Sequence, residues 1–133
     1  MVLKKKNSQL SFLHCYHHGI MVVCIYIGSK WLPGGPNCVL GVVNTFVHVI
    51  MYFYYFMAII NPNLKDSLWW KKYITQIQIA QFAVLVIHYM RNLLVTNCNY
   101  PQIFNLIIFV QNFFMLFMFG DFYRQNYLKW KSD

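Results

Sequence analysis

The stretch NCVLGVVNTFVHVIMYFYYFMAII, residues 37–60, decides the fold class of this chain. It contains no Lys, Arg, Asp or Glu, and its apolar residues run continuously instead of alternating. An α-helix needs about 20 such residues to cross the hydrocarbon core of a bilayer, whereas a membrane β-strand would alternate apolar and polar residues. We therefore predict that this stretch is a membrane-spanning helix.

Three further apolar stretches of similar length predict three more spanning helices, at residues 8–30, 71–94 and 102–124. Segments rich in proline, glycine and asparagine separate the four spans, at residues 33–36, 61–63 and 97–101. The sequence thus predicts an all-α, polytopic membrane helix bundle that forms a single membrane domain over residues 1–133.

The composition supports a membrane protein and excludes most soluble classes. Hydrophobic residues make up 59% of the chain and charged residues only 11%, where an ordinary soluble domain carries about 25% charge. The net charge of +8 does not indicate nucleic acid, because the basic residues lie at the ends of apolar runs. The four cysteines form no CxxC pair, which argues against a zinc site or a dense disulfide framework.

The distribution of basic residues predicts the orientation in the membrane. With four spans, the termini and the loop between the second and third spans share one side. That side holds nine of the 11 basic residues: Lys4, Lys5, Lys6, Lys65, Lys71, Lys72, Arg124, Lys129 and Lys131. Basic loops face the cytosol, so we expect a cytosolic C-terminus. Cys38 and Cys98 then lie on the opposite side, and the sequence leaves open whether either forms a disulfide.

Histidines within the first predicted span are the strongest functional signal. His14, His17 and His18 are spaced by three and four residues, which places them on one helical face. Ionisable side chains are costly in hydrocarbon, so three on one face indicate a functional site. Because imidazole titrates near neutral pH, it can act there as a nucleophile or as a general base.

Two other predicted spans carry polar residues at a comparable depth. The second has a stripe formed by Asn44, His48, Tyr52 and Tyr55, and the third has Thr75, Gln78 and Gln81. At 1.5 Å per residue, His17 and His48 lie roughly 14 and 18 Å from the cytosolic ends of their helices. We therefore expect a polar pocket at the bottom of an apolar tunnel that opens to the cytosol and suits an acyl chain.

The remaining intramembrane polar residues have simpler interpretations. For His88 alone a structural role is favoured. Asn105, Gln111 and Asn112 in the fourth span are interpreted as hydrogen-bonding side chains that hold helices together.

Metal binding is the competing interpretation of the histidines. The spacing His-x-x-His-His resembles the histidine boxes of membrane di-iron enzymes, and His17 with His48 could ligate a haem. The di-iron sites need about eight histidines in several boxes, whereas this chain has five histidines and one box. A haem would not explain the third histidine. We therefore predict acyl transfer, without a metal site or cofactor.

Four motifs together resemble the ELO family of very-long-chain fatty acid elongases. They are KKNSQLSFLHCYHH at 5–18, HVIMYFYY at 48–55, TQIQIAQ at 75–81 and CNYP at 98–101. The resemblance implies condensation of a long-chain acyl-CoA with malonyl-CoA to a 3-oxoacyl-CoA, without a further cofactor. It also implies the last four spans of a seven-span enzyme, so the chain looks like a partial elongase domain that lacks the N-terminal spans.

The resemblance also assigns residue roles. His17 would accept the acyl group, His48 would assist, and His14 and His18 would support the site. The residues expected to bind substrate are Asn44, Tyr52, Tyr55, Thr75, Gln78 and Gln81 in the tunnel, with Lys71 and Lys72 at the CoA phosphates.

The resemblance and the C-terminal sequence predict where the protein acts. Lys129 and Lys131 resemble a dilysine signal of the endoplasmic reticulum membrane. Expected partners are a second copy of the chain and other enzymes of the elongation cycle. The alternative functions are an inactive elongase fragment that associates with full-length subunits, and a histidine-ligated iron or haem protein.

Overall fold

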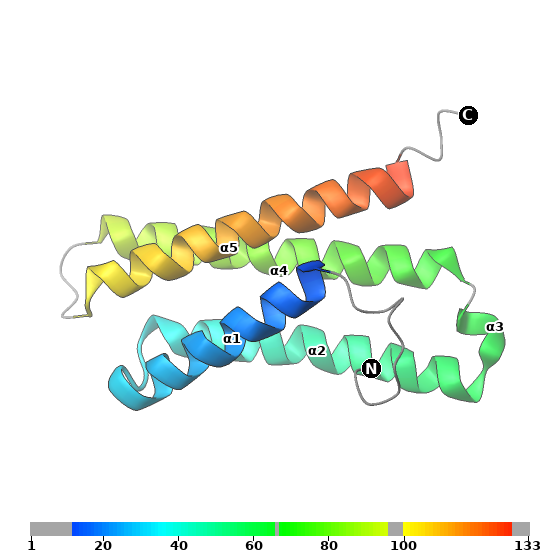
Figure 1. Ribbon diagram of the computed structural model, residues 1–133, viewed down its shortest axis with the longest axis horizontal. Coiled ribbons are helices and arrows are strands. Elements are labelled where there is room, and N and C mark those ends of the chain that lie inside the picture. The colour runs from blue at the N-terminus through cyan, green and yellow to red at the C-terminus, as the bar shows by residue number, and fades with distance from the viewer. Residues whose placement is uncertain (1–11, 66, 96–99, 129–133) are drawn as a thin grey trace. The chain divides into compact units, whose positions relative to one another are not determined.

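The computed structural model describes residues 12–65, 67–95 and 100–128, and every regular element in these ranges is a helix. The elements are α1 (Phe12–Trp31), α2 (Pro36–Ile60), α3 (Pro62–Lys65), α4 (Leu68–Leu94), α5 (Gln102–Tyr123) and the π-helical turn η2 (Arg124–Leu128). Figure 1 shows these elements along the chain. The predicted all-α class is therefore confirmed.

The four long helices occupy the four predicted spans. Three helical stretches are long and apolar enough to cross a membrane: Pro36–Ile60, Leu68–Leu94 and Gln102–Leu128. The fourth helix, α1, has a spanning length of 20 residues but is not one of these three. Three histidines and Lys30 lie among its 20 residues. The arrangement is that of a membrane helix bundle.

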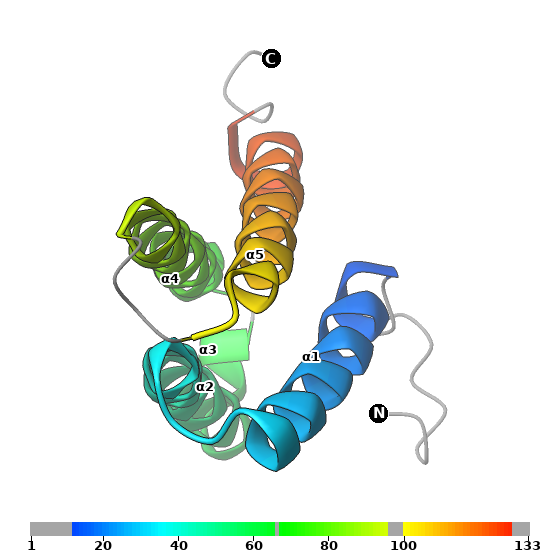
Figure 2. The ribbon, with the colours of Figure 1, turned by 90° about the vertical axis from the view of Figure 1, so that its left-hand side faces the viewer.

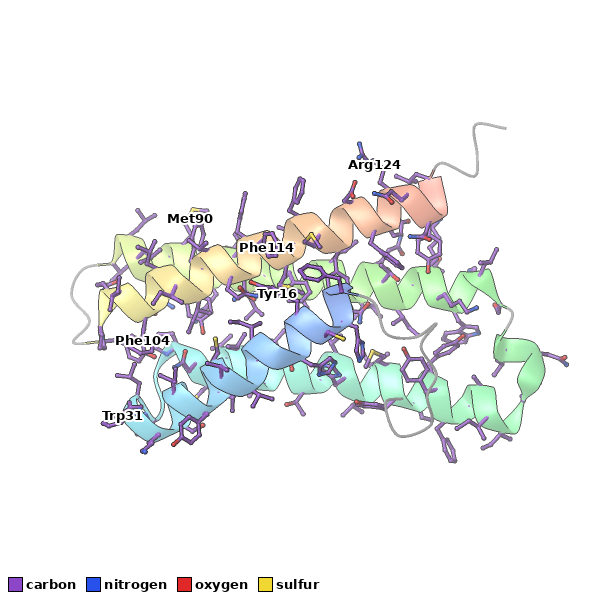
Figure 3. The ribbon with its side chains drawn as sticks, viewed as in Figure 1. Tyr16, Trp31, Met90, Phe104, Phe114 and Arg124 are labelled. Carbon is purple, nitrogen blue, oxygen red and sulfur yellow. The ribbon has the colours of Figure 1, made fainter. Side chains whose placement is uncertain are left out.

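The first unit of the chain extends to Asn37 and contains α1. The last turn of α1 holds Lys30, whose Nζ donates a hydrogen bond to the Tyr26 hydroxyl at 3.3 Å. The same ammonium lies 5.2 Å from the centroid of the Trp31 ring, at the end of the helix (Figure 3). A cation at a helix C-terminus is favoured by the helix dipole, and aromatic rings stabilise it further.

The turn after α1 is made by two glycines in the left-handed backbone region. Gly34 has φ +89° and Gly35 has φ +62°, values that L side chains rarely adopt. Pro36 then occupies the first position of α2, where its fixed φ suits a helix and its missing N–H is not needed. The Pro-Gly-Gly-Pro segment therefore ends one helix and starts the next.

The second unit begins at Cys38 and contains the other helices. Here α4 and α5 run side by side in opposite directions, as Figures 1 and 2 both show. Near one end, the Phe82 and Phe119 rings lie 5.2 Å apart, and Gln76 Nε2 donates to the Tyr123 hydroxyl at 2.8 Å. These two pairs fix the antiparallel alignment of α4 with α5.

A small apolar core joins α2 to the α4–α5 pair. It consists of four buried residues: Leu40, Leu85, Tyr89 and Ile108. Leu85 and Tyr89, both on α4, have no exposed surface at all. Two of the four core residues belong to α4, and α2 and α5 contribute one each, so α4 supplies the largest part of this core.

The connection between α2 and α4 is short and held by backbone hydrogen bonds. The Asn61 side chain accepts a hydrogen bond from the Asn63 N–H at 3.2 Å, which is an Asx turn. The single helical turn α3 follows, and the Ser67 N–H then donates to the Leu64 carbonyl at 3.2 Å, immediately before α4 begins. The chain thus reverses direction within seven residues.

Several sequence predictions concern residues outside the described ranges. They include the first residues of the first span, the amino-terminal lysines, Cys98, Lys129 and Lys131. In the described part of the chain, Cys15, Cys24 and Cys38 are free thiols.

Candidate active site

The three histidines of α1 form a compact group on one face of the helix. The ring centroids of His14 and His18 lie 4.5 Å apart, and those of His17 and His18 lie 5.4 Å apart. His17 is buried, whereas His14 and His18 are partly exposed. The predicted spacing therefore brings the His18 ring close to the rings of both His14 and His17.

The polar stripe of α2 is also a continuous set of neighbours. His48 and Tyr52 stack with ring centroids 5.9 Å apart, and the Tyr52 ring lies 6.3 Å from the Tyr55 ring. Asn44 and His48 are half-buried. Tyr52 and Tyr55 are 59% and 44% exposed.

The three polar residues of α4 differ in what they contact. Thr75 is buried, and its hydroxyl donates back to the Lys71 carbonyl of its own helix at 2.9 Å. Gln78 reaches across to α2, where its Nε2 donates to Met51 Sδ at 3.5 Å. Gln81 is only 5% exposed. Gln78 is therefore the polar residue that links α4 to α2.

The contact between Met51 and Gln78 also aligns the predicted residues of the two helices. The helices α2 and α4 are antiparallel, and Met51 lies opposite Gln78. The residue three positions before Met51 is therefore at the same level as the residue three positions after Gln78. Those positions are His48 and Gln81, which therefore come to the same level along the helix pair. The second unit thus places His48 and Gln81 at one level of the helix pair, and the histidines of α1 belong to the first unit.

The first turns of α4 carry both predicted phosphate-binding lysines. Lys71 is exposed and Lys72 is half-buried, and no acidic residue lies in the first turn. Three exposed aromatic side chains accompany them: Trp69, Trp70 and Tyr73. The Trp69 ring contacts both of the others, at 4.9 and 4.4 Å between centroids.

A metal site in the described residues would need three or more nearby His, Cys, Asp or Glu side chains. In residues 12–65, 67–95 and 100–128, no three His, Cys, Asp or Glu side chains are arranged to share an ion. In particular, the three neighbouring histidines of α1 do not form such an arrangement.

The polar residues that were given structural interpretations make contacts within their own helices. His88 Nε2 lies 3.0 Å from the Asn92 side-chain nitrogen, one turn along α4. Asn112 Nδ2 donates to the Ile108 carbonyl at 2.8 Å, and Asn105 Nδ2 donates to Gln102 Oε1 at 3.4 Å. These contacts lie within single helices, and the role of Asn105, Gln111 and Asn112 in holding helices together stays a prediction.

One site neighbour was missed by the sequence analysis. Tyr54 lies between two tyrosines that were selected, yet it is the buried one, at 8% exposure. Its position within the predicted motif HVIMYFYY was visible in the sequence. The direction of its side chain was not, because that depends on where α3 and α4 lie.

Long apolar helices, an imidazole cluster on α1 and polar side chains at a shared level on α2 and α4 define the class of multi-pass membrane proteins. The ELO: GNS1/SUR4 family matches the chain over residues 1–133. The chain therefore belongs to this elongase family.

Individual relatives agree with the family match. The chain is 42% identical over 126 residues to a very long chain fatty acid elongase of Aedes aegypti, covering 95% of this chain and 35% of that protein. It is 41% identical over 128 residues to very long chain fatty acid elongase 7 of Drosophila melanogaster, covering 96% of this chain and 39% of that protein.

A human relative gives the same picture. The chain is 38% identical over 133 residues to human very long chain fatty acid elongase 1, covering 98% of this chain and 47% of that protein. The chain thus spans less than half the length of these three relatives.

Proposed function

We propose that this chain carries the histidine-containing part of a very-long-chain 3-oxoacyl-CoA synthase. Such an enzyme condenses a long-chain acyl-CoA with malonyl-CoA and releases CoA and carbon dioxide. The observation that carries the proposal is the histidine cluster of α1 in a chain of the elongase family: the His18 ring centroid lies 4.5 Å from that of His14 and 5.4 Å from that of His17. The names of the relatives support the same activity.

In the proposed reaction His17 is the nucleophile. A ring nitrogen of His17 attacks the thioester carbonyl of the acyl-CoA, the carbon–sulfur bond breaks, and CoA leaves as a thiol after protonation. The product is an acyl-imidazole, which is an activated acyl group. His14 and His18, whose rings contact each other, support the orientation of this face and help accommodate the charge that develops on the imidazole.

Malonyl-CoA supplies the carbon nucleophile for the second step. Loss of carbon dioxide leaves an electron pair on the carbon next to its thioester, and this carbon attacks the acyl-imidazole. The carbon–nitrogen bond breaks, His17 is regenerated and a 3-oxoacyl-CoA is released. Decarboxylation provides the carbanion, so this chemistry needs no metal or redox cofactor.

The other site residues bind or orient the substrates in this proposal. His48 acts as a base or holds the thioester, and Gln81 lies at the same level on α4. The remaining substrate-binding residues are Asn44, Tyr52, Tyr55, Thr75 and Gln78. Lys71 and Lys72, in the first turn of α4, contact the CoA phosphates as cations.

We further propose that the protein resides in the endoplasmic reticulum membrane with its C-terminus in the cytosol. A cytosolic opening gives acyl-CoA and malonyl-CoA direct access to the site. The proposed partners are a second copy of the chain and the enzymes that reduce and dehydrate the 3-oxoacyl product.

A labelling experiment in microsomes that contain the chain tests the proposal. Incubation with labelled acyl-CoA alone should transfer the label to the protein and release CoA, and added malonyl-CoA should discharge the label into 3-oxoacyl-CoA. His17→Ala should abolish both steps. His88→Ala is the matched control, because this histidine contacts Asn92 within α4 and lies outside the proposed site.

The labelling pattern of these variants shows whether this chain catalyses the reaction or only belongs to the family. Transfer of label to wild type and to the His88→Ala variant, but not to the His17→Ala variant, supports the proposal. Equal labelling of the His17→Ala variant would exclude His17 as the nucleophile. If the wild-type chain neither accepts label nor incorporates malonyl carbon, the proposal that this chain catalyses the condensation is wrong.

A further inference from the structure

Three tyrosines lie within four residues near the end of α2, but only one of them is buried. Tyr54 is 8% exposed, whereas Tyr52 is 59% and Tyr55 is 44% exposed. Tyr54 also differs in its partners, because it contacts the segment that follows α2 as well as its own helix. The substrate-binding role proposed for Tyr52 and Tyr55 does not account for this third side chain.

The contacts of Tyr54 join three elements. Its hydroxyl donates to the carbonyl of Leu64, in α3, at 3.2 Å. Its ring lies nearly parallel to that of Trp70, on α4, with 6.5 Å between centroids and 28° between the planes. A single side chain of α2 is therefore attached both to the connection and to the helix beyond it.

The Leu64 carbonyl is an important point of the connection. It accepts a second hydrogen bond, from the Ser67 N–H at 3.2 Å, and α4 begins at the next residue, Leu68. Fixing this carbonyl relative to α2 therefore fixes where α4 starts. In an α-helix, a shift by one residue moves a side chain about 1.5 Å along the axis and about 100° around it.

The alignment that Tyr54 controls is the one on which the proposed site depends. The Gln78–Met51 contact of 3.5 Å, three residues before Tyr54 on α2, belongs to the same helix pair. The same alignment brings His48 and Gln81 to one level. A displacement of the α4 start by one residue would move Gln81 about 1.5 Å along the axis and about 100° around it relative to His48.

We propose that Tyr54 is a positioning residue, whose hydroxyl anchors the connection between α2 and α4 and thereby holds His48 and Gln81 opposite each other. This inference rests on the proposed function insofar as it concerns catalysis. Its geometric part, the control of the α2–α4 alignment, stands independently of any activity.

The geometric part is tested by cross-linking in the membrane. In a chain whose four native cysteines are replaced by alanine, Met51→Cys and Gln78→Cys are introduced, and the rate of cross-linking by a short bifunctional thiol reagent is measured. Adding Tyr54→Phe removes only the hydroxyl and should slow the reaction at least about twofold, as expected for the loss of one hydrogen bond. A smaller effect would overturn the inference.

Tyr73→Phe is the matched control for this experiment. Tyr73 is also a tyrosine near the start of α4, but it is 45% exposed and its ring contacts Trp69 of its own helix. Its hydroxyl has no place in the connection, so the cross-linking rate should stay within about 1.5-fold of the parent. An equal slowing by both variants would also overturn the inference, since the effect would then not be specific to Tyr54.

The catalytic part is tested by steady-state kinetics on wild-type cysteines. Tyr54→Phe should raise KM for acyl-CoA several-fold at an unchanged level of folded protein, because a misaligned site binds the thioester less well. A purely structural role would lower the maximal rate through loss of folded protein and leave KM unchanged. If wild type has no activity, the proposed function fails, and the cross-linking experiment still decides the positioning role.

Discussion

Replacement of Asn105 by leucine should stabilise the protein. Asn105 is 1% exposed, and its Oδ1 finds no hydrogen-bond donor among the described residues. Its Nδ2 makes only a long bond of 3.4 Å to Gln102, one turn away in α5. The site therefore buries an amide oxygen whose desolvation is not compensated by a hydrogen bond.

The expected gain follows from the cost of such a group. Burying an unpartnered amide costs about 1–3 kcal/mol in protein mutational data. Leucine has the same number of side-chain heavy atoms in the same branched arrangement as asparagine, although its methyl groups are bulkier. After subtraction of the weak bond to Gln102, we expect Asn105→Leu to stabilise the fold by about 1–2 kcal/mol. For a chain of this size, that corresponds to a rise in melting temperature of about 3–10 °C.

Thermal unfolding in detergent micelles, followed by far-ultraviolet circular dichroism, measures this effect. Asn112→Leu is the control, because Asn112 is similarly buried but its Nδ2 already donates to the Ile108 carbonyl at 2.8 Å. That substitution removes an existing hydrogen bond, so the stability should fall by about 0.5–1.5 kcal/mol. A melting temperature for Asn105→Leu that is no higher than that of Asn112→Leu would refute the reasoning, because both variants add the same bulk at a buried position.

Three further predictions concern the turn, the α4–α5 pair and the core. Gly34→Ala should destabilise the fold by about 1–2 kcal/mol, because Gly34 has φ +89°. Gly19→Ala, in the middle of α1 with free space around it, should stabilise the fold by about 0.5–1 kcal/mol, and melting temperatures measure both effects. A double-mutant cycle of Gln76→Leu and Tyr123→Phe should give a coupling of about 0.5–1 kcal/mol, and zero coupling would exclude a contribution from the 2.8 Å bond. Leu85→Ala, at a fully buried position, should destabilise by about 1–3 kcal/mol in the same assay, less than in a soluble core because lipid also solvates apolar groups, and an unchanged melting temperature would contradict the described core.

The positions of the long helices could be predicted from the sequence because two simple signals determine them. The thickness of the bilayer sets the length of each apolar run, and Pro33, Pro36 and Pro101 mark the ends. The main difference is at α4, which starts at Leu68 and not at Lys71. The predicted start excluded Leu68, Trp69 and Trp70, which form the first turn of α4.

The elements between the spans could not be predicted in the same way. The one-turn helix α3 and the π-helical turn η2 have no apolar period of their own. η2 is held by local contacts, in which the Asp121 carboxylate accepts hydrogen bonds from Arg124 at 2.8 Å and from Gln125 at 2.5 Å. Figure 3 places Arg124 at this end of α5. Such contacts depend on side-chain directions that a single sequence does not specify.

The candidate site was predictable as a set of helical faces but not as a set of contacts. Spacings of three and four residues correctly grouped the imidazoles of α1, because neighbours on a helix surface must lie close together. The same spacing selected Tyr52 and Tyr55 and passed over Tyr54, which points toward α3 and α4. Which tyrosine is buried depends on the packing of other helices, and the helical period of α2 alone contains no such information.

Because of the length of α4, the thickness of the surrounding bilayer should affect how this helix is tilted in the membrane. Its 27 residues extend about 40 Å, some 10 Å more than a typical hydrocarbon layer. The excess must be absorbed by inclination or by projection of the first two turns among the headgroups, where indole and phenol rings such as those of Trp69 and Tyr73 are favoured. Gln78 and Gln81 lie on the same helix. A thinner or thicker bilayer that changes the tilt of α4 should therefore change the depth and orientation of these two amides in the membrane.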